Sequence, residues 1–183
     1  MAHPAEFFDF YRRRFVYLAA EPNPGHYALA ELERRGHLAA VVTQNIDGLH
    51  QAAGSKTVYE LHGSIRRAHC MDCRAHYTLD YILHHRPIPH CSCGGIVRPD
   101  VVLYEESLDT ATIEGAVAAI RAADTLIIGG TSLIVYPAAG LIDYFRGAHL
   151  ILINKSETSA DARAELVIRE PIGDVLHEAL PEE

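Results

Sequence analysis

The sequence predicts an α/β fold in which a doubly wound parallel sheet carries a small inserted module. Short apolar stretches of strand length alternate with helical segments along most of the chain. Each apolar stretch ends in Gly, Ser, Thr or Asn, as strands of a parallel sheet commonly do before a helix begins. Four cysteines interrupt this alternation. A chain of 183 residues suits one such domain with an insertion.

The elements follow from the spacing of apolar residues and from the positions of helix breakers. Apolar residues recur at helical spacing from Pro4 to Ala20, and the stretch EPNPG then breaks the helix. A second helix is expected to end at Gly36. The remaining helices and the strands are predicted over the following ranges: helices 26–35, 112–123, 137–146 and 172–180; strands around 39–42, within 99–106, 124–132, 149–156 and 164–170.

The stretch from Arg66 to Arg98 differs from the rest because it contains all four cysteines and has little apolar periodicity. Cys70-x-x-Cys73 and Cys91-x-Cys93 each supply half of a tetrahedral set of thiolates, which is typical of structural zinc sites. Four thiolates leave no open position, so we expect one structural Zn²⁺. Four buried free cysteines or an iron–sulfur cluster are the alternatives. Residues 66–98 are therefore predicted to be a zinc-binding module, organised by metal rather than by an apolar core.

Composition limits the class of protein. The net charge of -8 argues against nucleic acid as the main partner, because binding to phosphates needs clustered Lys and Arg. The N-terminus has neither the basic start nor the apolar stretch of a secretory signal. The uncharged run 126–142 contains several glycines and a proline, which suits a strand, turn and helix better than a membrane span. A cytoplasmic protein with no membrane partner is expected.

Polar residues cluster where three strands are predicted to end. In open parallel sheets, ligands bind beyond the carboxyl ends of the strands. The glycine turn GGTS could approach a phosphate or ribose closely, although many such turns serve packing alone. INKS is equally suited to a ribose or to an ordinary helix cap. TQNID is the densest group, since its polar side chains are costly without hydrogen-bond partners.

His62 in YELHGS allows three interpretations: a metal ligand, a packed core residue, or a residue that performs chemistry. The four cysteines already complete a tetrahedron, so the metal does not need it. The core and the chemical interpretations remain open at this point.

Taken together, TQNIDGLH, LHGS, the two cysteine pairs, RPDVVLYEE, GGTSLIVYPAAG and INKS resemble the sirtuins, and the bacterial members most. Sirtuins are NAD-dependent protein lysine deacylases. The resemblance covers essentially the whole chain, in family order and at family spacing. It implies a Rossmann-like NAD-binding domain, residues 1–65 and 99–183, plus the zinc module, with NAD and an acyl-lysine peptide meeting between them.

The resemblance also implies roles for individual residues. His62 matches the catalytic histidine, a general base toward the nicotinamide ribose once the acyl oxygen has displaced nicotinamide; histidines ordinarily titrate near neutral pH. The implied products are nicotinamide, the deacylated lysine and O-acyl-ADP-ribose. The other matched positions are Gln44, Asn45, Ile46 and Asp47 for nicotinamide and its ribose; Gly130, Thr131 and Ser132 for the phosphate and ribose region; Asn154, Lys155 and Val175 for adenosine; and Val101, Val102 and Leu103 for the peptide, which would add as a strand.

The sequence departs from the family pattern in two places. It begins downstream of the G-A-G-x-S turn and the P-D-F-R segment, so the first strand and phosphate loop of the sheet are expected to be missing. The family's F-G-E reads Tyr104-Glu105-Glu106. The alternative to a deacetylase is therefore a truncated, impaired remnant that only binds a peptide or partner. A zinc-ribbon nucleic-acid binder is disfavoured by the negative net charge.

One further resemblance concerns the acyl group. Tyr11-x-x-Arg14 is similar to the Tyr and Arg with which desuccinylating sirtuins hold an acidic acyl group. An arginine-rich helix face is the alternative interpretation.

Overall fold

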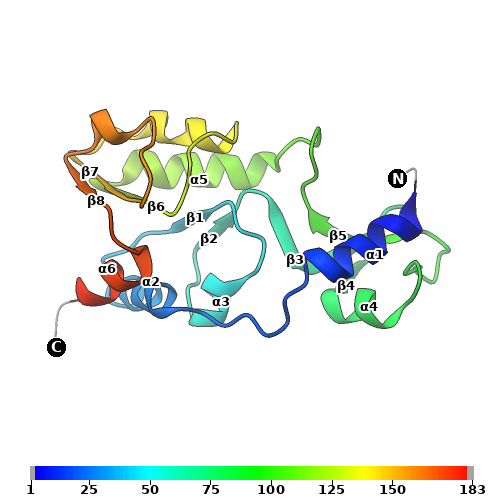
Figure 1. Ribbon diagram of the computed structural model, residues 1–183. Helices are drawn as coiled ribbons and strands as arrows, with labels where there is room; N and C mark the ends of the chain where they lie inside the picture. Colours follow the sequence, from blue (N-terminus) through cyan, green and yellow to red (C-terminus); the bar gives the residue numbers. More distant parts are fainter. Residues whose placement is uncertain (1–2, 181–183) are drawn as a thin grey trace. The chain divides into compact units, whose positions relative to one another are not determined.

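The computed structural model describes residues 3–180. The chain divides into two compact units (Figure 1). The first unit consists of Met1–Ala20, Asn45–Gly48 and His62–Ser107, and the second of Glu21–Gln44, Leu49–Leu61 and Leu108–Glu183. The unit that contains the cysteines is thus wider than 66–98, and the predicted domain boundaries stay a prediction. Within residues 3–180, no helix has the length and apolar character needed to cross a membrane.

The second unit contains the predicted parallel sheet in two parts (Figure 1). The order β6-β7-β8 joins Thr125–Gly129, His149–Ile153 and Leu166–Ile168, and every pair is parallel. The other part pairs β1 (Val41–Thr43) with β2 (Val58–Glu60), also in parallel. The parallel α/β architecture predicted from the sequence is therefore confirmed.

Helices cover both faces of β7, as in a doubly wound fold. Leu150 and Leu152 belong to a cluster with Ala139 of the 3₁₀ helix η1 (Ala138–Tyr144). Ile151 and Ile153 pack instead with residues of α2 (Pro24–Arg34) and α6 (Ile172–Glu178). Successive strand residues point to opposite faces, so the two clusters lie on opposite sides of the sheet. Helix α5 (Thr110–Ala122) packs with η1 and β2 in a further cluster.

Two predicted helices differ from those in the structure. The first, α1, spans only Pro4–Arg14, because Phe15 and Val16 leave the helix and pack against the apolar cluster of the first unit. The predicted helix 137–146 is a 3₁₀ helix over Ala138–Tyr144. Glycine weakens an α-helix from within, and Gly140 lies in the middle of this segment. Short elements that the sequence did not predict as such are α3 (Leu49–Ala53) and η2 (Asp161–Arg163).

The first unit is built on an antiparallel sheet that the sequence did not predict. Its order is β4-β3-β5, formed by His76–Thr78, Gly63–Cys70 and Val97–Val101. Helix α4 (Leu79–His84) follows β4 directly. Helix α1 packs here too: Phe8 and Tyr11 are fully buried in a cluster with Ile82 and Val97. The expectation that metal rather than a core organises this region was therefore wrong, since the region has both.

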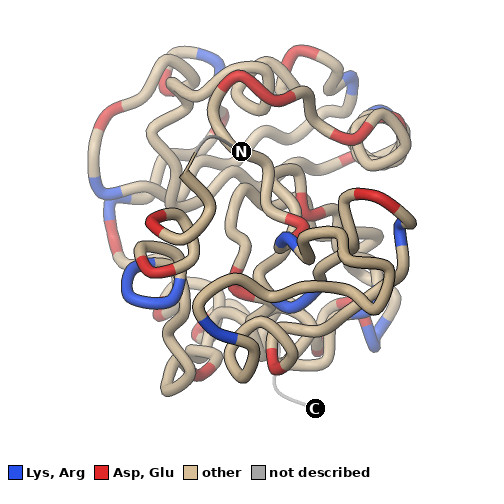
Figure 2. The backbone as a smooth tube through the Cα atoms, turned by 90° about the vertical axis from the view of Figure 1, so that its right-hand side faces the viewer, with Lys and Arg blue, Asp and Glu red and all other residues tan. Residues whose placement is uncertain are grey.

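Charged residues are interspersed along the described backbone, with Lys and Arg among Asp and Glu (Figure 2). Several form local pairs. Glu31 accepts two hydrogen bonds from Arg34 and one from Arg35 at 2.5–2.6 Å, and these three bonds lower the pKa of Glu31 to about 2. The Arg34 side chain is exposed, so water screens its pair with Glu31, and such a pair contributes little to stability.

Candidate active site and zinc centre

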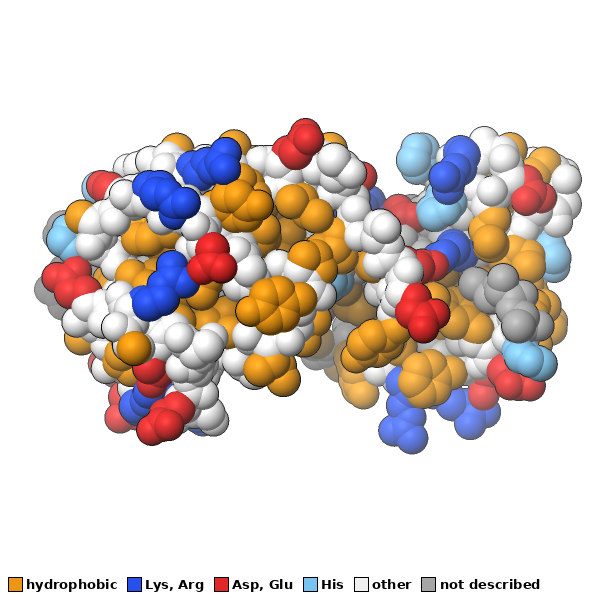
Figure 3. Space-filling view, turned by 90° about the horizontal axis from the view of Figure 1, so that it is seen from above, with side chains coloured by type: hydrophobic (Ala, Val, Ile, Leu, Met, Phe, Trp, Pro, Cys, Tyr) orange, Lys and Arg blue, Asp and Glu red, His pale blue; other side chains and the backbone are white. Residues whose placement is uncertain are grey.

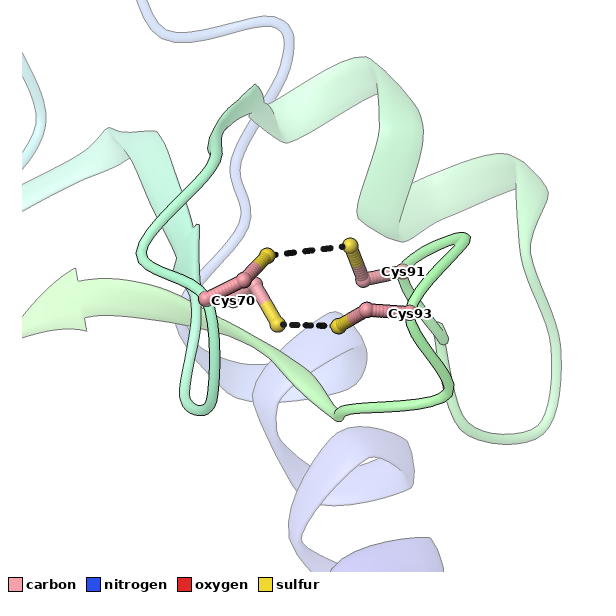
Figure 4. A group of neighbouring side chains, drawn as sticks. Cys70, Cys91 and Cys93 are labelled. Atoms are coloured by element: carbon pink, nitrogen blue, oxygen red, sulfur yellow. Dashed lines mark hydrogen bonds between the residues drawn. The ribbon is translucent and has the colours of Figure 1, made fainter.

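The four cysteines lie together in the first unit. Cys70 ends strand β3, Cys73 lies in the turn after it, and the other two occupy the loop before β5. The sulfur atoms point toward one another (Figure 4), with 3.5 Å from Cys70 Sγ to Cys93 Sγ and from Cys73 Sγ to Cys91 Sγ. All four sulfurs lie within 4.8 Å of one another.

This geometry fits zinc. A tetrahedral ion with Zn–S bonds of about 2.3 Å places its sulfurs about 3.8 Å apart, close to the distances found here. The surroundings favour the thiolate at Cys91, because the N–H of Cys93 is the main cause that lowers the pKa of Cys91 to about 6. The pKa of Cys93 is raised to about 12: the N–H of Gly95 favours its thiolate, but the adjacent thiols of Cys70 and Cys91 outweigh it. Four thiolates placed this close together would repel one another, and a bound divalent cation offsets that repulsion. The tetrad is a structural zinc site.

The predicted nucleotide residues of the second unit meet at one edge of its sheet. Gly129 pairs with Ile153 in the β6–β7 register, and the N–H of Gly130 donates to the Ile153 carbonyl at 3.1 Å. The turn after β6 and the residues after β7 therefore begin side by side. Gly130 has a φ of +61°. This left-handed conformation favours glycine and leaves an exposed backbone, which suits the close approach of a ribose or phosphate.

Thr131 links this turn to the end of β1. Its hydroxyl lies 3.5 Å from Nε2 of Gln44 and also accepts the N–H of Leu133 at 3.2 Å. Ser132 is exposed beside it. The structure thus brings Gln44 together with the GGTS turn, although 87 positions separate Gln44 from Thr131 in the sequence.

The Asn154 side chain forms a hydrogen bond within its own loop. Its side-chain Nδ2 donates to the Ser156 carbonyl at 2.8 Å, while Lys155 is exposed. Arg169 organises the same loop by donating to the carbonyls of Asn154 and Ser156 and by pairing with Asp161. Arg169 was not predicted as a site residue. Its position directly after strand β8, beside the end of β7, was the available signal.

Val175 lies on α6 and packs in the apolar cluster beneath β7. The same helix reaches the nucleotide edge, because a Cβ added at Gly129 would overlap the Ile172 side chain. Glycine at position 129 therefore permits the close contact between α6 and the end of β6.

The loop after Ser132 exposes apolar side chains. Leu133 has a φ of +54° and is buried, whereas Ile134, Val135 and Tyr136 are exposed. Figure 3 shows hydrophobic side chains gathered on this face of the second unit. A hollow of about 270 Å³ lies here, lined by residues of α5, η1 and the loop before it, among them Ile113, Tyr136 and Leu141.

His62 lies in the first unit, at the turn that leads into β3, and is half-buried. Its carbonyl accepts the N–H of Val102 at 3.0 Å. The next residue, Gly63, has a φ of +76°, and an added Cβ would overlap the Asp100 carbonyl. His62 and the predicted peptide segment are therefore joined through their backbones.

The TQNID group divides between the units. Gln44 belongs to the second unit, while Asn45, Ile46 and Asp47 belong to the first. The Ile46 carbonyl accepts the N–H of Ile65 at 2.9 Å, and the Asp47 carbonyl accepts Nε of Arg66 at 3.2 Å. Residues 45–47 thus run beside β3, a few residues from His62.

The predicted peptide segment begins in a strand and leaves it at once. Val101 ends β5 and is buried, whereas Val102 and Leu103 are half-buried after it. The segment is followed by fully exposed Tyr104 and by Glu105, whose φ is +71°.

Glu106 forms an ion pair with Arg98 that was not predicted from the sequence. Arg98 Nη1 and Nη2 each donate to a Glu106 carboxylate oxygen at 2.7 Å. These bonds are the main cause that holds the pKa of Glu106 below its ordinary value.

Tyr11 does not offer its hydroxyl to a ligand. The side chain is 1% exposed, and the hydroxyl donates to the Ile65 carbonyl at 3.2 Å. Arg14 is exposed at the last position of α1. The arginine-rich helix face is therefore favoured over a site for acidic acyl groups.

A parallel α/β unit with a polar strand edge, together with a four-cysteine zinc unit, defines a class of zinc-containing, nucleotide-binding α/β proteins. The chain belongs to the Sir2 family, whose sequence profile matches residues 1–137. It is 61% identical over 176 residues to the "NAD-dependent protein deacetylase" of Clostridium perfringens, covering 95% of this chain and 72% of that protein. It is 55% identical to the protein of the same name from Cutibacterium acnes, covering 95% and 71%.

Solved structures agree. A Sir2 protein described as "Sir2-p53 peptide-NAD+" has a TM-score of 0.87 at 37% identity, covering 97% of this chain and 77% of that one. "Sir2 bound to acetylated peptide" has a TM-score of 0.88 at 35% identity, with the same coverage. These similarities confirm the resemblance drawn from the sequence motifs.

Proposed function

We propose that the protein is an NAD-dependent protein lysine deacetylase that transfers the acyl group of an acyl-lysine to ADP-ribose and releases nicotinamide. The observation that carries this proposal is the 61% identity, over nearly the whole chain, to a protein named for that activity. NAD is a substrate here, acetyl-lysine proteins are the second substrate, and the zinc ion is structural. A remnant that only binds peptides is not favoured, because the similarity extends through both units.

In this proposal each unit supplies one part of the reaction. The turn of Gly130–Ser132 would bind the phosphate and ribose region of NAD, and Asn154, Lys155 and Val175 the adenosine. Gln44 and Asn45–Asp47 would hold nicotinamide and its ribose. Val101–Leu103 would pair with the peptide backbone, and His62 would take up a proton from a ribose hydroxyl as general base.

The fit of these residues rests on three observations. Gly130 has a left-handed conformation and an exposed backbone at the carboxyl end of β6. The Thr131 hydroxyl lies near Gln44 Nε2. The Val102 N–H donates to the His62 carbonyl, so the proposed base and the proposed peptide segment are joined by one backbone hydrogen bond.

We further propose a cytoplasmic location. A four-thiolate zinc site needs reduced cysteines, and reducing compartments such as the cytosol maintain them.

Nicotinamide release tests the function. The protein would be incubated with NAD and an acetyl-lysine peptide, and so would a version extended at its N-terminus to the length of its relatives. His62→Ala should lower kcat at least about 100-fold, the usual contribution of a general base, without changing the zinc content. His84→Ala, an exposed histidine of α4 in the same unit, is the matched control and should retain activity. No nicotinamide release from either length, or full activity of His62→Ala, would contradict the proposal.

A further inference from the structure

One ion pair connects Arg98 in strand β5 to Glu106 in the segment that follows the strand. The Arg98 guanidinium meets the Glu106 carboxylate through two parallel bonds of 2.7 Å. The Arg98 side chain is 17% exposed and that of Glu106 38%. Paired bonds of this kind fix the orientation of both groups, which a single contact between point charges does not do.

The same pair binds the backbone between its two residues. Glu106 Oε2 also accepts the N–H of Leu103 at 3.0 Å, and Arg98 Nη2 also donates to the Val101 carbonyl at 3.1 Å. The N–H of Glu106 itself donates to the Leu103 carbonyl at 3.1 Å. Residues 98–106 therefore form a loop that the ion pair closes, and the backbone bonds at Val101 and Leu103 connect to this pair.

The loop connects directly to His62. Between its two anchored positions lies Val102, whose N–H donates to the His62 carbonyl at 3.0 Å. Gly63 and Val101 are register partners between β3 and β5, and the space at Gly63 admits no side chain. A shift of the loop would therefore displace the backbone of His62.

The ion pair is poorly suited to stabilisation alone. In the described part of the chain, Arg98 Nε is buried and has no hydrogen-bond partner. A buried donor without a partner costs free energy, and replacing a partly buried ion pair by apolar residues is often neutral or stabilising. A charged pair at this position therefore calls for a role beyond holding the unit together.

We propose that Arg98 and Glu106 are positioning residues for the acyl-lysine peptide: they set the backbone of Val101–Leu103 and, through Val102, that of His62. This inference rests on the proposed function. The N–H groups of Val102 and Leu103 are both engaged within the protein. The carbonyls of Val101 and Leu103 each accept one bond already, but a carbonyl oxygen can accept a second. The peptide would therefore pair with this segment by donating its own N–H groups to these oxygens and to the Val102 carbonyl.

Glu106→Gln tests the inference, because it keeps the shape of the side chain and removes its charge. Amide exchange at Val102 and Leu103 should become about tenfold faster, the effect of losing one charge-assisted hydrogen bond. The KM for an acetyl-lysine peptide should rise about tenfold, while the KM for NAD stays unchanged. Arg98→Lys, which keeps the charge and loses the fork, should fall between Glu106→Gln and the original protein. Asp143→Asn is the matched control, since it breaks an exposed pair with Arg163 at 2.6 Å in the second unit.

The outcomes separate the two proposals. A Glu106→Gln protein with a lower melting temperature but unchanged amide exchange at Val102 and unchanged peptide KM would overturn the positioning role. Equal effects from Asp143→Asn would also overturn it. If neither the unsubstituted chain nor its N-terminally extended version releases nicotinamide, the deacetylase proposal fails. The exchange rates at Val102 and Leu103 then still decide whether the ion pair fixes this segment.

Discussion

The two units of the protein achieve order in different ways. The second unit relies on strand alternation: Leu150 and Leu152 face one helix layer, and Ile151 and Ile153 face the other. The first unit combines a short antiparallel sheet with the buried side chains of α1 and with four cysteines. Metal binding becomes folding free energy where no site exists in the unfolded chain, whereas apolar burial depends on no ion. The two units should therefore respond differently to the same perturbation.

Metal removal gives the largest expected difference. Structural zinc contributes an apparent free energy on the order of 10 kcal/mol in small zinc domains. Chelation, or Cys70→Ser, should abolish amide protection in β3 and β5 while β6 and β7 remain protected. Hydrogen exchange with zinc analysis measures this.

Ser92 lies between Cys91 and Cys93 in the sequence but is not a zinc ligand. The Ser92→Ala protein should therefore retain one zinc ion and full amide protection in β3 and β5. Equal protection in the first unit with and without metal would contradict the structural role of zinc. Loss of protection in β7 at the same time would show that the two units do not unfold separately.

A core substitution in the second unit is the converse test. Leu152 is fully buried, so Leu152→Ala should lower the free energy of unfolding by about 2–5 kcal/mol through lost burial and a residual cavity. The zinc content should stay at one ion per chain. Chemical denaturation followed by circular dichroism gives the first quantity, and metal analysis the second.

Leu166→Ala is the control for that test, because Leu166 in the same sheet is 49% exposed. Its effect should be clearly smaller than that of Leu152→Ala. A loss of zinc from folded Leu152→Ala protein would instead indicate that the metal site depends on the parallel sheet.

The smallest expected effect concerns backbone strain in the first unit. Glu105 has a φ of +71°, a conformation that costs an L-residue roughly 1–2 kcal/mol. Glu105→Gly removes this cost but increases the freedom of the unfolded chain, so a net stabilisation of up to about 1 kcal/mol is expected. Thermal denaturation measures it. Glu105→Ala keeps the strain and removes the charge, and should be nearly neutral. A stabilisation of equal size in both variants would assign the effect to charge.

Local features of the sequence determined much of the second unit and the whole metal site. The spacing of Cys70, Cys73, Cys91 and Cys93 was sufficient, because ligands two or three residues apart on tight turns can reach one ion. The parallel strands followed from short apolar stretches with polar ends. The cysteine spacing and the apolar stretches could be recognised in the sequence because each depends only on residues that are close together in the chain.

Only the tertiary structure decided how distant segments combine. The burial of Phe8 and Tyr11 of α1 against the cysteine-containing sheet has no local pattern, since the partners lie tens of residues away. The division of TQNID between units and the Arg98–Glu106 pair are of the same kind. The sequence by itself determined which groups could bind metal and nucleotide. Long-range packing and directional hydrogen bonds, which leave no periodic pattern in the chain, decided where His62 and its neighbours are held.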